Sequence, residues 1–167
     1  GGYDVLQMLL DAKRGGAAVV GTAVCQRTLG ETHLMAYVET EKPRIFTGEN
    51  DHRGGDGFRP VTPEELDTAI KLAEHGDART PLLPVARISG SFFAVNLAWV
   101  REHWPRPPWF LFGHVDGTLR VLGEDHWFCD KVRAVGGKVL CDPRFIPLHR
   151  SPTRLLGRSA LGKVDVR

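Results

Sequence analysis

Residues 123–149, GEDHWFCDKVRAVGGKVLCDPRFIPLH, contain the pattern that decides the fold. Glu124 and Asp125 are acids in the first turn of an expected helix, where the helix dipole favours negative charge. Acids are common at helix starts, so this position alone favours a role in helix stability over one in catalysis. One face of the same helix is apolar and consists of Phe128, Val132 and Val135.

The chain after this helix is expected to return to the acids. Gly136-Gly137 ends the helix, and residues 138–141, with the apolar run Val139-Leu140-Cys141, predict a strand. A helix of about twelve residues rises roughly 18 Å, and about six extended residues return roughly 20 Å. The segment that ends at His149 is therefore expected to approach Asp125 at the loop-bearing end of a sheet, where ligands bind in open α/β folds.

The rest of the chain alternates between strand and helix patterns. Residues 17–24 are a run of small and β-branched residues, typical of a strand buried on both faces. Helices are expected after the capping residues Asp4, Thr62 and Asn96. Further strands are expected at 33–40 and 44–47, and loops at 48–59 and 109–122. The predicted fold class is α/β, with a layered sheet flanked by helices.

Composition excludes several classes of protein. The net charge of +2 over 167 residues, with basic and acidic residues interleaved, does not favour nucleic acid as a partner. No apolar run is long enough to span a bilayer, and no signal peptide pattern opens the chain. The three cysteines have no CxxC spacing, which favours free buried thiols in a cytoplasmic protein. The opening Gly1-Gly2-Tyr3, without an initiator methionine, indicates a fragment or a processed chain.

Four segments of the chain resemble GT-A-fold glycosyltransferases of family 2, and they occur along the chain in the same order as in that family. The run from Gly123 to Arg150 resembles that family's last conserved block, in which an ED pair opens a helix of the form ED-x-x-F-C-x-x-x-R-x-x-G-G. In the family a strand, a proline and a histidine follow. The upstream similarities are ISGSFFAV at 88–95, Pro108-Trp109-Phe110, and YDVLQMLL at 3–10 with AVVG at 18–21, which resembles the stretch after the DxD motif.

The resemblance covers residues 3–150 and implies the C-terminal, acceptor-side half of a Rossmann-like GT-A domain. Residues 1–150 are then a partial GT-A domain with a mixed sheet flanked by helices, and residues 151–167 a C-terminal tail. The family's nucleotide-binding half and its DxD carboxylates do not occur in this chain. The resemblance therefore also implies that the chain alone has little or no activity, and that its partner is the missing half or a second copy.

The resemblance assigns roles to three residues. Asp125 matches the general base that removes a proton from an acceptor hydroxyl as it attacks the donor sugar, and Glu124 is expected to orient Asp125 or the acceptor. His149 matches a histidine that completes a divalent metal site beneath the diphosphate of the donor. The implied cofactor is Mn²⁺ or Mg²⁺, and a mixed carboxylate and imidazole set favours Mn²⁺. The implied reaction is inverting transfer from a nucleotide-sugar donor to a carbohydrate, lipid or protein acceptor.

Two further segments are candidate substrate-binding residues. Ser89-Gly90-Ser91 is expected to let backbone approach the sugar or acceptor, and a bulge in a strand is an equal alternative. Trp109 and Phe110 are candidates for an apolar platform under a sugar ring, although ordinary burial beneath a proline-rich loop is favoured slightly.

Two other functions remain open. A non-catalytic remnant of the same fold, retained to bind carbohydrate or a protein partner, is favoured by the missing DxD motif. A small metal-dependent hydrolase that uses some of the seven histidines ranks lower, because the sequence has no HxH, HExxH or HxxxH pair.

Overall fold

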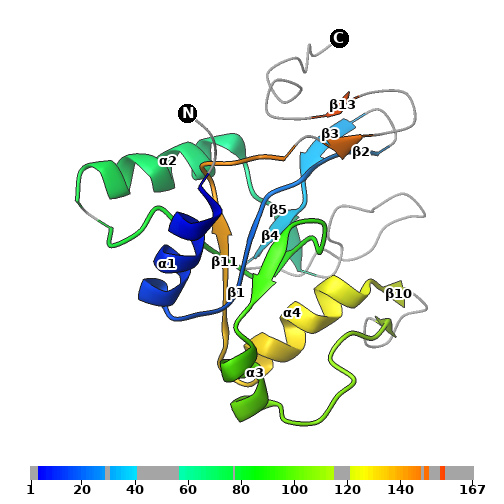
Figure 1. Cartoon of the computed structure of the whole chain (residues 1–167). Coiled ribbons are helices and arrows are strands. Elements are labelled where there is room, and N and C mark those ends of the chain that lie inside the picture. Colours follow the sequence, from blue (N-terminus) through cyan, green and yellow to red (C-terminus); the bar gives the residue numbers. More distant parts are fainter. Residues whose placement is uncertain are drawn as a thin grey trace.

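The structure is a computed structural model that describes residues 4–28, 31–40, 57–76, 78–114, 121–147, 149–150 and 155–156. Its centre is a four-stranded mixed sheet with the strand order β6-β11-β1-β8. The strands are β1 (Ala17–Thr22), β6 (Leu83–Val85), β8 (Phe93–Val95) and β11 (Lys138–Asp142). β1 and β11 are parallel, whereas β8 and β6 are antiparallel to their neighbours. The expected α/β fold with a mixed sheet flanked by helices is confirmed (Figure 1).

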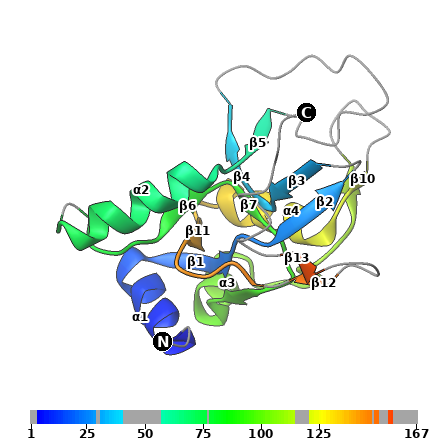
Figure 2. The same ribbon diagram turned by 90° about the horizontal axis from the view of Figure 1, so that it is seen from above.

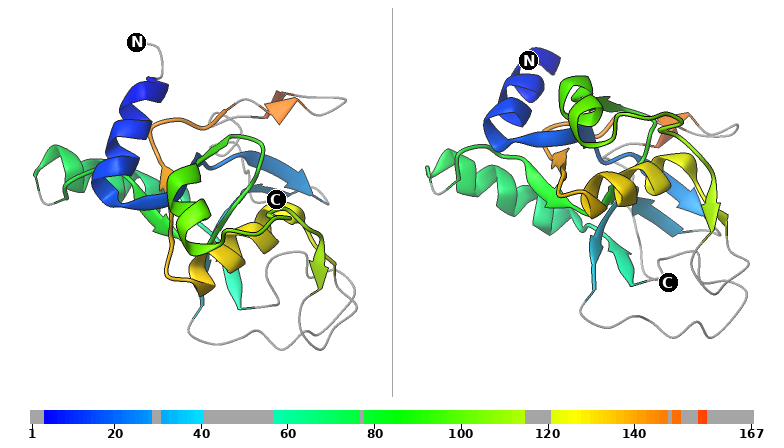
Figure 3. Two further views of the ribbon diagram at one scale, coloured as in Figure 1. Left: turned by 60° about the horizontal axis from the view of Figure 1, so that its bottom comes forward. Right: turned by 90° about the horizontal axis from the view of Figure 1, so that it is seen from below.

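Helices cover both faces of this sheet (Figures 2 and 3). On one face, α1 (Val5–Gly15) packs Met8 and Ala12 against side chains of β1 and β11. On the other face, α4 (Glu124–Ala134) buries Phe128 and Val132, and α3 (Leu97–His103) buries Val100 in the same cluster. β1 lies between these layers and is buried at every position, as its uninterrupted apolar run predicts.

Short sheets extend the molecule beyond the central one. β4 (Ala36–Glu39) pairs with β5 (Phe58–Pro60) on one side and with β7 (Arg87–Ile88) on the other. Three two-stranded ribbons and helix α2 (Pro63–Glu74) complete the described elements. The ribbons are β2 (Cys25–Thr28) with β3 (Glu31–Leu34), β9 (Gly113–His114) with β10 (Val121–Leu122), and β12 (His149–Arg150) with β13 (Leu155–Leu156).

Helix starts follow the sequence closely. The Asp4 side chain caps α1, Asn96 caps α3, and Thr62 and Glu65 form a reciprocal capping box at α2. α1 ends at Gly16, which has a φ of 68°, a conformation that glycine adopts without strain. The predicted caps are confirmed because the hydrogen bonds that start a helix are local in sequence.

Several strands and loops differ from the prediction. The strand expected at 33–40 is two strands, β3 and β4, and the loop expected at 48–59 contains most of β5. The loop expected at 109–122 carries β9 and β10 at its end. β4 and β5 are defined by pairing with segments remote in sequence, whereas β3, β9 and β10 belong to short hairpins, and hydrophobic periodicity reports neither kind of pairing. The strand expected at 44–47 lies outside the described residues.

The three cysteines are free and buried, as the sequence predicts. Burial raises the pKa of the Cys129 and Cys141 thiols to about 12 and also raises that of Cys25. These thiols are therefore protonated at neutral pH and serve as small apolar core residues.

The direction of the strands fixes where the functional site lies. β1 and β11 are parallel, so both end at the same edge of the sheet. In the antiparallel register Phe93 is opposite Gly21, near the end of β1, so β8 starts at that edge and the turn before it lies there too. The carboxyl edge is the end of the sheet at which the parallel strands β1 and β11 terminate. Open α/β sheets place their ligand sites at this end.

Candidate functional site

Asp125, in the first turn of α4, lies at the carboxyl edge with both carboxylate oxygens engaged. The Gly90 backbone N–H donates to Oδ2 over 2.8 Å, and the His126 backbone N–H donates to Oδ1 over 2.8 Å. The bond to Gly90 joins residues 35 positions apart in sequence. The side chain is half-buried, and its two hydrogen bonds within the described residues use two of roughly four lone-pair positions. The carboxylate is thus fixed in orientation and still partly accessible.

A side chain at Gly90 would crowd both Phe93 and Asp125. A Cβ at this residue would lie 2.9 Å from Cε1 of Phe93 and 3.2 Å from Cβ of Asp125. Sequence reasoning expected the 89–91 segment to approach a sugar or acceptor. The described contact is with Asp125, and it brings two candidate segments together that the sequence named separately.

The two serines beside Gly90 stabilise the turn. The Ser89 hydroxyl lies 3.0 Å from the Ser91 hydroxyl and accepts a 3.3 Å hydrogen bond from the Ser91 backbone N–H. Ser89 is buried, whereas Gly90 and Ser91 are exposed. The outer part of the turn therefore faces solvent beside Asp125.

An ion pair holds the strand before this turn against α4. Arg87, in β7, donates to Asp130 of α4 through Nε over 2.8 Å and Nη2 over 2.7 Å. The Arg87 guanidinium also lies 3.7 Å from the centre of the Phe58 ring. This two-point ion pair connects the strand before Gly90 to the helix that carries Asp125. It therefore fixes the distance between the turn and the helix. Sequence reasoning missed this pair, whose members are 43 residues apart.

Aromatic rings pack around Phe93, whose ring lies beside Gly90. Phe110 stacks on Phe128 at a centroid distance of 4.4 Å and lies 6.1 Å from Phe93, and it remains 44% exposed. Trp109 is half-buried and donates its indole N–H to the Trp104 carbonyl over 3.1 Å. This geometry favours burial beneath the loop for Trp109, whereas Phe110 keeps an exposed surface beside the turn.

The structure describes the backbone of His149 but not its side chain. β11 ends at the carboxyl edge, and the chain continues from there to β12, which starts at His149 (Figure 1). Asp125 therefore lies at the same edge of the sheet from which the chain leaves β11 to reach β12. Glu124 is exposed, and the Asp125 contacts within the described residues are the two amides given above. The roles predicted for His149 and Glu124 stay predictions.

A metal site is not formed by the described residues alone. They contain no group of three His, Cys, Asp or Glu side chains placed to hold a metal ion. The implied Mn²⁺ or Mg²⁺ therefore stays a prediction, and no step of the proposed mechanism passes through a metal.

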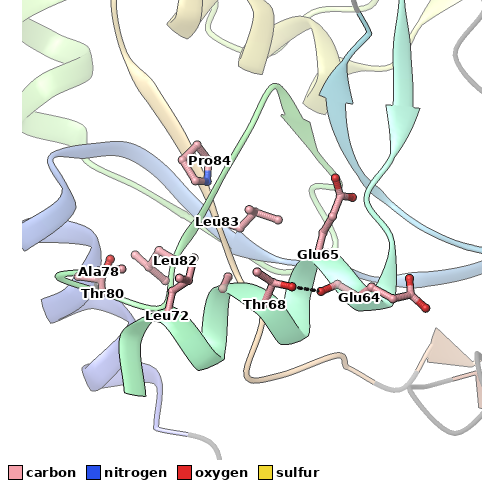
Figure 4. A pocket seen from close by; sticks show the side chains of 10 residues that line it. Glu64, Glu65, Thr68, Leu72, Ala78, Thr80, Leu82, Leu83 and Pro84 are labelled. Carbon is pink, nitrogen blue, oxygen red and sulfur yellow. Dashed lines mark hydrogen bonds between the residues drawn. The ribbon is translucent and has the colours of Figure 1, made fainter. Parts of the chain in front are cut away.

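Two surface hollows lie away from Asp125. One, of about 400 Å³, separates α2 from residues 78–84. Figure 4 shows Leu72 and Leu82 at one end of it and Glu64 and Glu65 at the other. Glu65 is already bound by Arg59 and by the Thr62 amide, which lower the pKa of its carboxyl group. The second, of about 330 Å³, lies between α1, β1 and β8.

Comparison with protein-family models, with curated proteins and with solved structures finds no match for this chain. Among the described helices, none combines the length and the apolar character that crossing a bilayer requires.

Proposed function

We propose that this chain supplies the acceptor-side half of a GT-A-fold, family 2 glycosyltransferase, which transfers a sugar from a nucleotide-sugar donor to an acceptor hydroxyl. The observation that carries the proposal is the Asp125 carboxylate, held at the carboxyl edge by the Gly90 amide. Segments that resemble the family at both residues meet there in space. Phe110 adds an exposed apolar surface beside them.

Asp125 acts as the general base in this proposal. The acceptor oxygen attacks the anomeric carbon of the donor, a new carbon–oxygen bond forms, and the bond to the nucleoside diphosphate breaks with inversion. The hydroxyl proton passes to Asp125, whose carboxylate has unused lone pairs and is half-buried beside the exposed turn. Gly90 and Arg87 are positioning residues, because they hold the carboxylate and its helix against the turn.

Replacing Asp125 by Asn tests the proposal. The variant is assayed in the assembled enzyme, meaning this chain together with the nucleotide-binding half, with a panel of nucleoside diphosphate sugars. Transfer is expected to fall about 10²- to 10⁴-fold, the usual contribution of a general base, while calorimetry shows unchanged donor binding. Glu74→Gln, an exposed acid in the last turn of α2, is the control and retains activity. A rate for Asp125→Asn within a few-fold of wild type rejects Asp125 as the base.

The second candidate is a non-catalytic remnant that binds carbohydrate or a protein partner. The observation that favours it is the apolar surface of α1, where Leu6 is 71% and Leu10 51% exposed. Calorimetry with nucleoside diphosphates and Mn²⁺ separates the two functions. Saturable, metal-dependent binding by the assembled protein supports transfer, whereas glycan binding without any nucleotide binding supports the remnant.

A further inference from the structure

The segment between α3 and β9, residues 104–113, is packed against α4 by its aromatic side chains (Figure 1). The Trp104 and Phe110 rings stack on the Phe128 ring at centroid distances of 6.0 and 4.4 Å. Phe110 also lies 6.1 Å from the Phe93 ring, whose Cε1 is 2.9 Å from the position of a Cβ at Gly90. The 104–113 segment therefore reaches the turn that holds the proposed base.

One side chain of α4, Trp127, contacts both ends of this segment. At the start of the segment, the Trp104 ring lies 5.6 Å from the Trp127 ring, within the range of an aromatic contact. At its end, a Cβ at Gly113 would lie 2.1 Å from Cδ1 and 2.8 Å from Nε1 of Trp127, so a larger residue would collide with the indole. The half-buried Trp127 ring thus closes residues 104–113 into a loop.

The loop presents an apolar surface beside the site. Leu111 is 43% and Phe112 72% exposed, next to the exposed face of Phe110. The Asp125 carboxylate is fixed independently, because both of its described hydrogen bonds come from backbone N–H groups outside the 104–113 segment. The placement of the apolar surface therefore depends on Trp127, whereas the orientation of the carboxylate does not.

We propose that Trp127 is a positioning residue of the acceptor subsite. It holds the 104–113 segment so that its apolar surface lies against an acceptor whose hydroxyl is at Asp125. The proposal rests on the proposed function, which places the acceptor there. A purely structural role predicts a different result, because loss of the indole would then lower stability without a selective effect on acceptor binding.

Steady-state kinetics of the assembled enzyme test the proposal. Trp127→Ala is expected to raise the acceptor KM by about tenfold or more, with kcat and the donor KM within about threefold of wild type. Trp127→Phe is expected to restore most of the acceptor affinity, because a ring again lies between the two ends of the segment. Gly113→Ala, which changes the other side of the same contact, is expected to raise the acceptor KM as Trp127→Ala does.

Trp99→Ala is the matched control. Trp99 of α3 is also half-buried and also packs on a glycine, since a Cβ at Gly137 would lie 2.6 Å from its Cη2. Gly137 lies beyond the C-terminal end of α4, away from Asp125. This variant is expected to lose stability and to keep the wild-type acceptor KM. Equal changes in acceptor KM for the Trp99 and Trp127 variants overturn the proposal, as does a lower kcat of Trp127→Ala with an unchanged acceptor KM.

A proton NMR measurement on the chain alone tests the contact without any activity. The Gly113 Hα resonances are expected to be displaced by the ring current of the Trp127 indole, because the two groups are in contact. Trp127→Ala is expected to return these resonances to the ordinary glycine range, whereas Trp99→Ala leaves them displaced. Gly113 resonances that are the same in Trp127→Ala and in wild type overturn the proposal.

The two proposals fail in different ways. If Trp127→Ala raises the acceptor KM while Asp125→Asn retains transfer, the positioning residue is correct and the general base is wrong. If Asp125→Asn abolishes transfer while Trp127→Ala keeps the wild-type acceptor KM, the base is correct and the positioning residue is wrong.

Discussion

The acids in the first turns of α1 and α4 accept hydrogen bonds from different parts of the chain. At α1, Oδ1 of Asp4 accepts from the Leu6 and Gln7 backbone N–H groups over 2.9 and 3.2 Å, which satisfies two donors within the helix. At α4 the capping position is Gly123, which has no side chain to accept a hydrogen bond. Asp125, in the first turn, accepts from the neighbouring His126 N–H and also from the Gly90 N–H in a distant turn.

The difference separates an acid whose described hydrogen bonds are all local from one that also bonds to a segment remote in sequence. Asp4 is exposed, and its described hydrogen bonds are local. Asp125 bonds across the molecule, and a Cβ at Gly123 would lie 3.0 Å from its Oδ1. Both acids have the sequence signature of a helix start, so a tertiary contact distinguishes them.

The same two helices also differ in what they bury. Phe128 of α4 is fully buried and stacks on Phe110, whereas Leu10 of α1 is 51% exposed. Phe128→Ala is expected to lower the free energy of unfolding by about 3–5 kcal/mol, and Leu10→Ala by no more than about 0.5 kcal/mol. Urea denaturation of both variants, followed by circular dichroism, measures the two losses.

Equal losses for Phe128→Ala and Leu10→Ala would contradict this contrast. They would mean that the exposed apolar surface of α1 is covered in the isolated chain, for example by self-association. Repeating the Leu10→Ala measurement at two protein concentrations detects that case, because the stability of an associating chain depends on concentration.

The inner face of α1 carries a buried charge, which gives a second test. Asp11 is 3% exposed, and its Oδ2 lies 2.9 Å from the Arg144 guanidinium, which also pairs with Asp142 of β11. Asp11→Asn is expected to cost about 1–3 kcal/mol, because an amide replaces a charged acceptor in a buried network that ties α1 to β11. Thermal unfolding measures the loss. Glu74→Gln serves as an exposed control, and a similar effect of both substitutions would show that the Asp11 network contributes nothing.

The smallest expected effect concerns the two capping positions. Asp4→Ala is expected to cost about 1 kcal/mol, because two amides at the start of α1 lose their acceptor. Gly123→Ala removes no side-chain cap at α4, and its expected effect is a displaced Asp125 and slower transfer by the assembled enzyme. Unfolding curves and initial rates of both variants test this. A loss of stability in Gly123→Ala as large as that in Asp4→Ala, with unchanged transfer, would remove the distinction between the two helix starts.

Local chemistry made a large part of the fold predictable. The caps at Asp4, Thr62 and Asn96, the buried run of β1 and the helix that begins at Glu124 all depend on residues within a few positions of one another. The sequence missed β5 and β9, and it gave one strand in place of β3 and β4. Those strands are short and are defined by backbone pairing, with remote partners for β4 and β5 and hairpin partners for β3 and β9.

The sequence by itself determined that the chain is α/β, that its thiols are buried, and that Glu124 and Asp125 open a helix after a loop. Periodicity and capping carry this information because they act over one or two turns. The tertiary structure adds that Gly90 bonds to Asp125, that the ion pair of Arg87 and Asp130 joins β7 to α4, and that β8 is an edge strand of the described sheet. Such contacts depend on strand order and direction, which a linear pattern of apolar and polar residues does not encode.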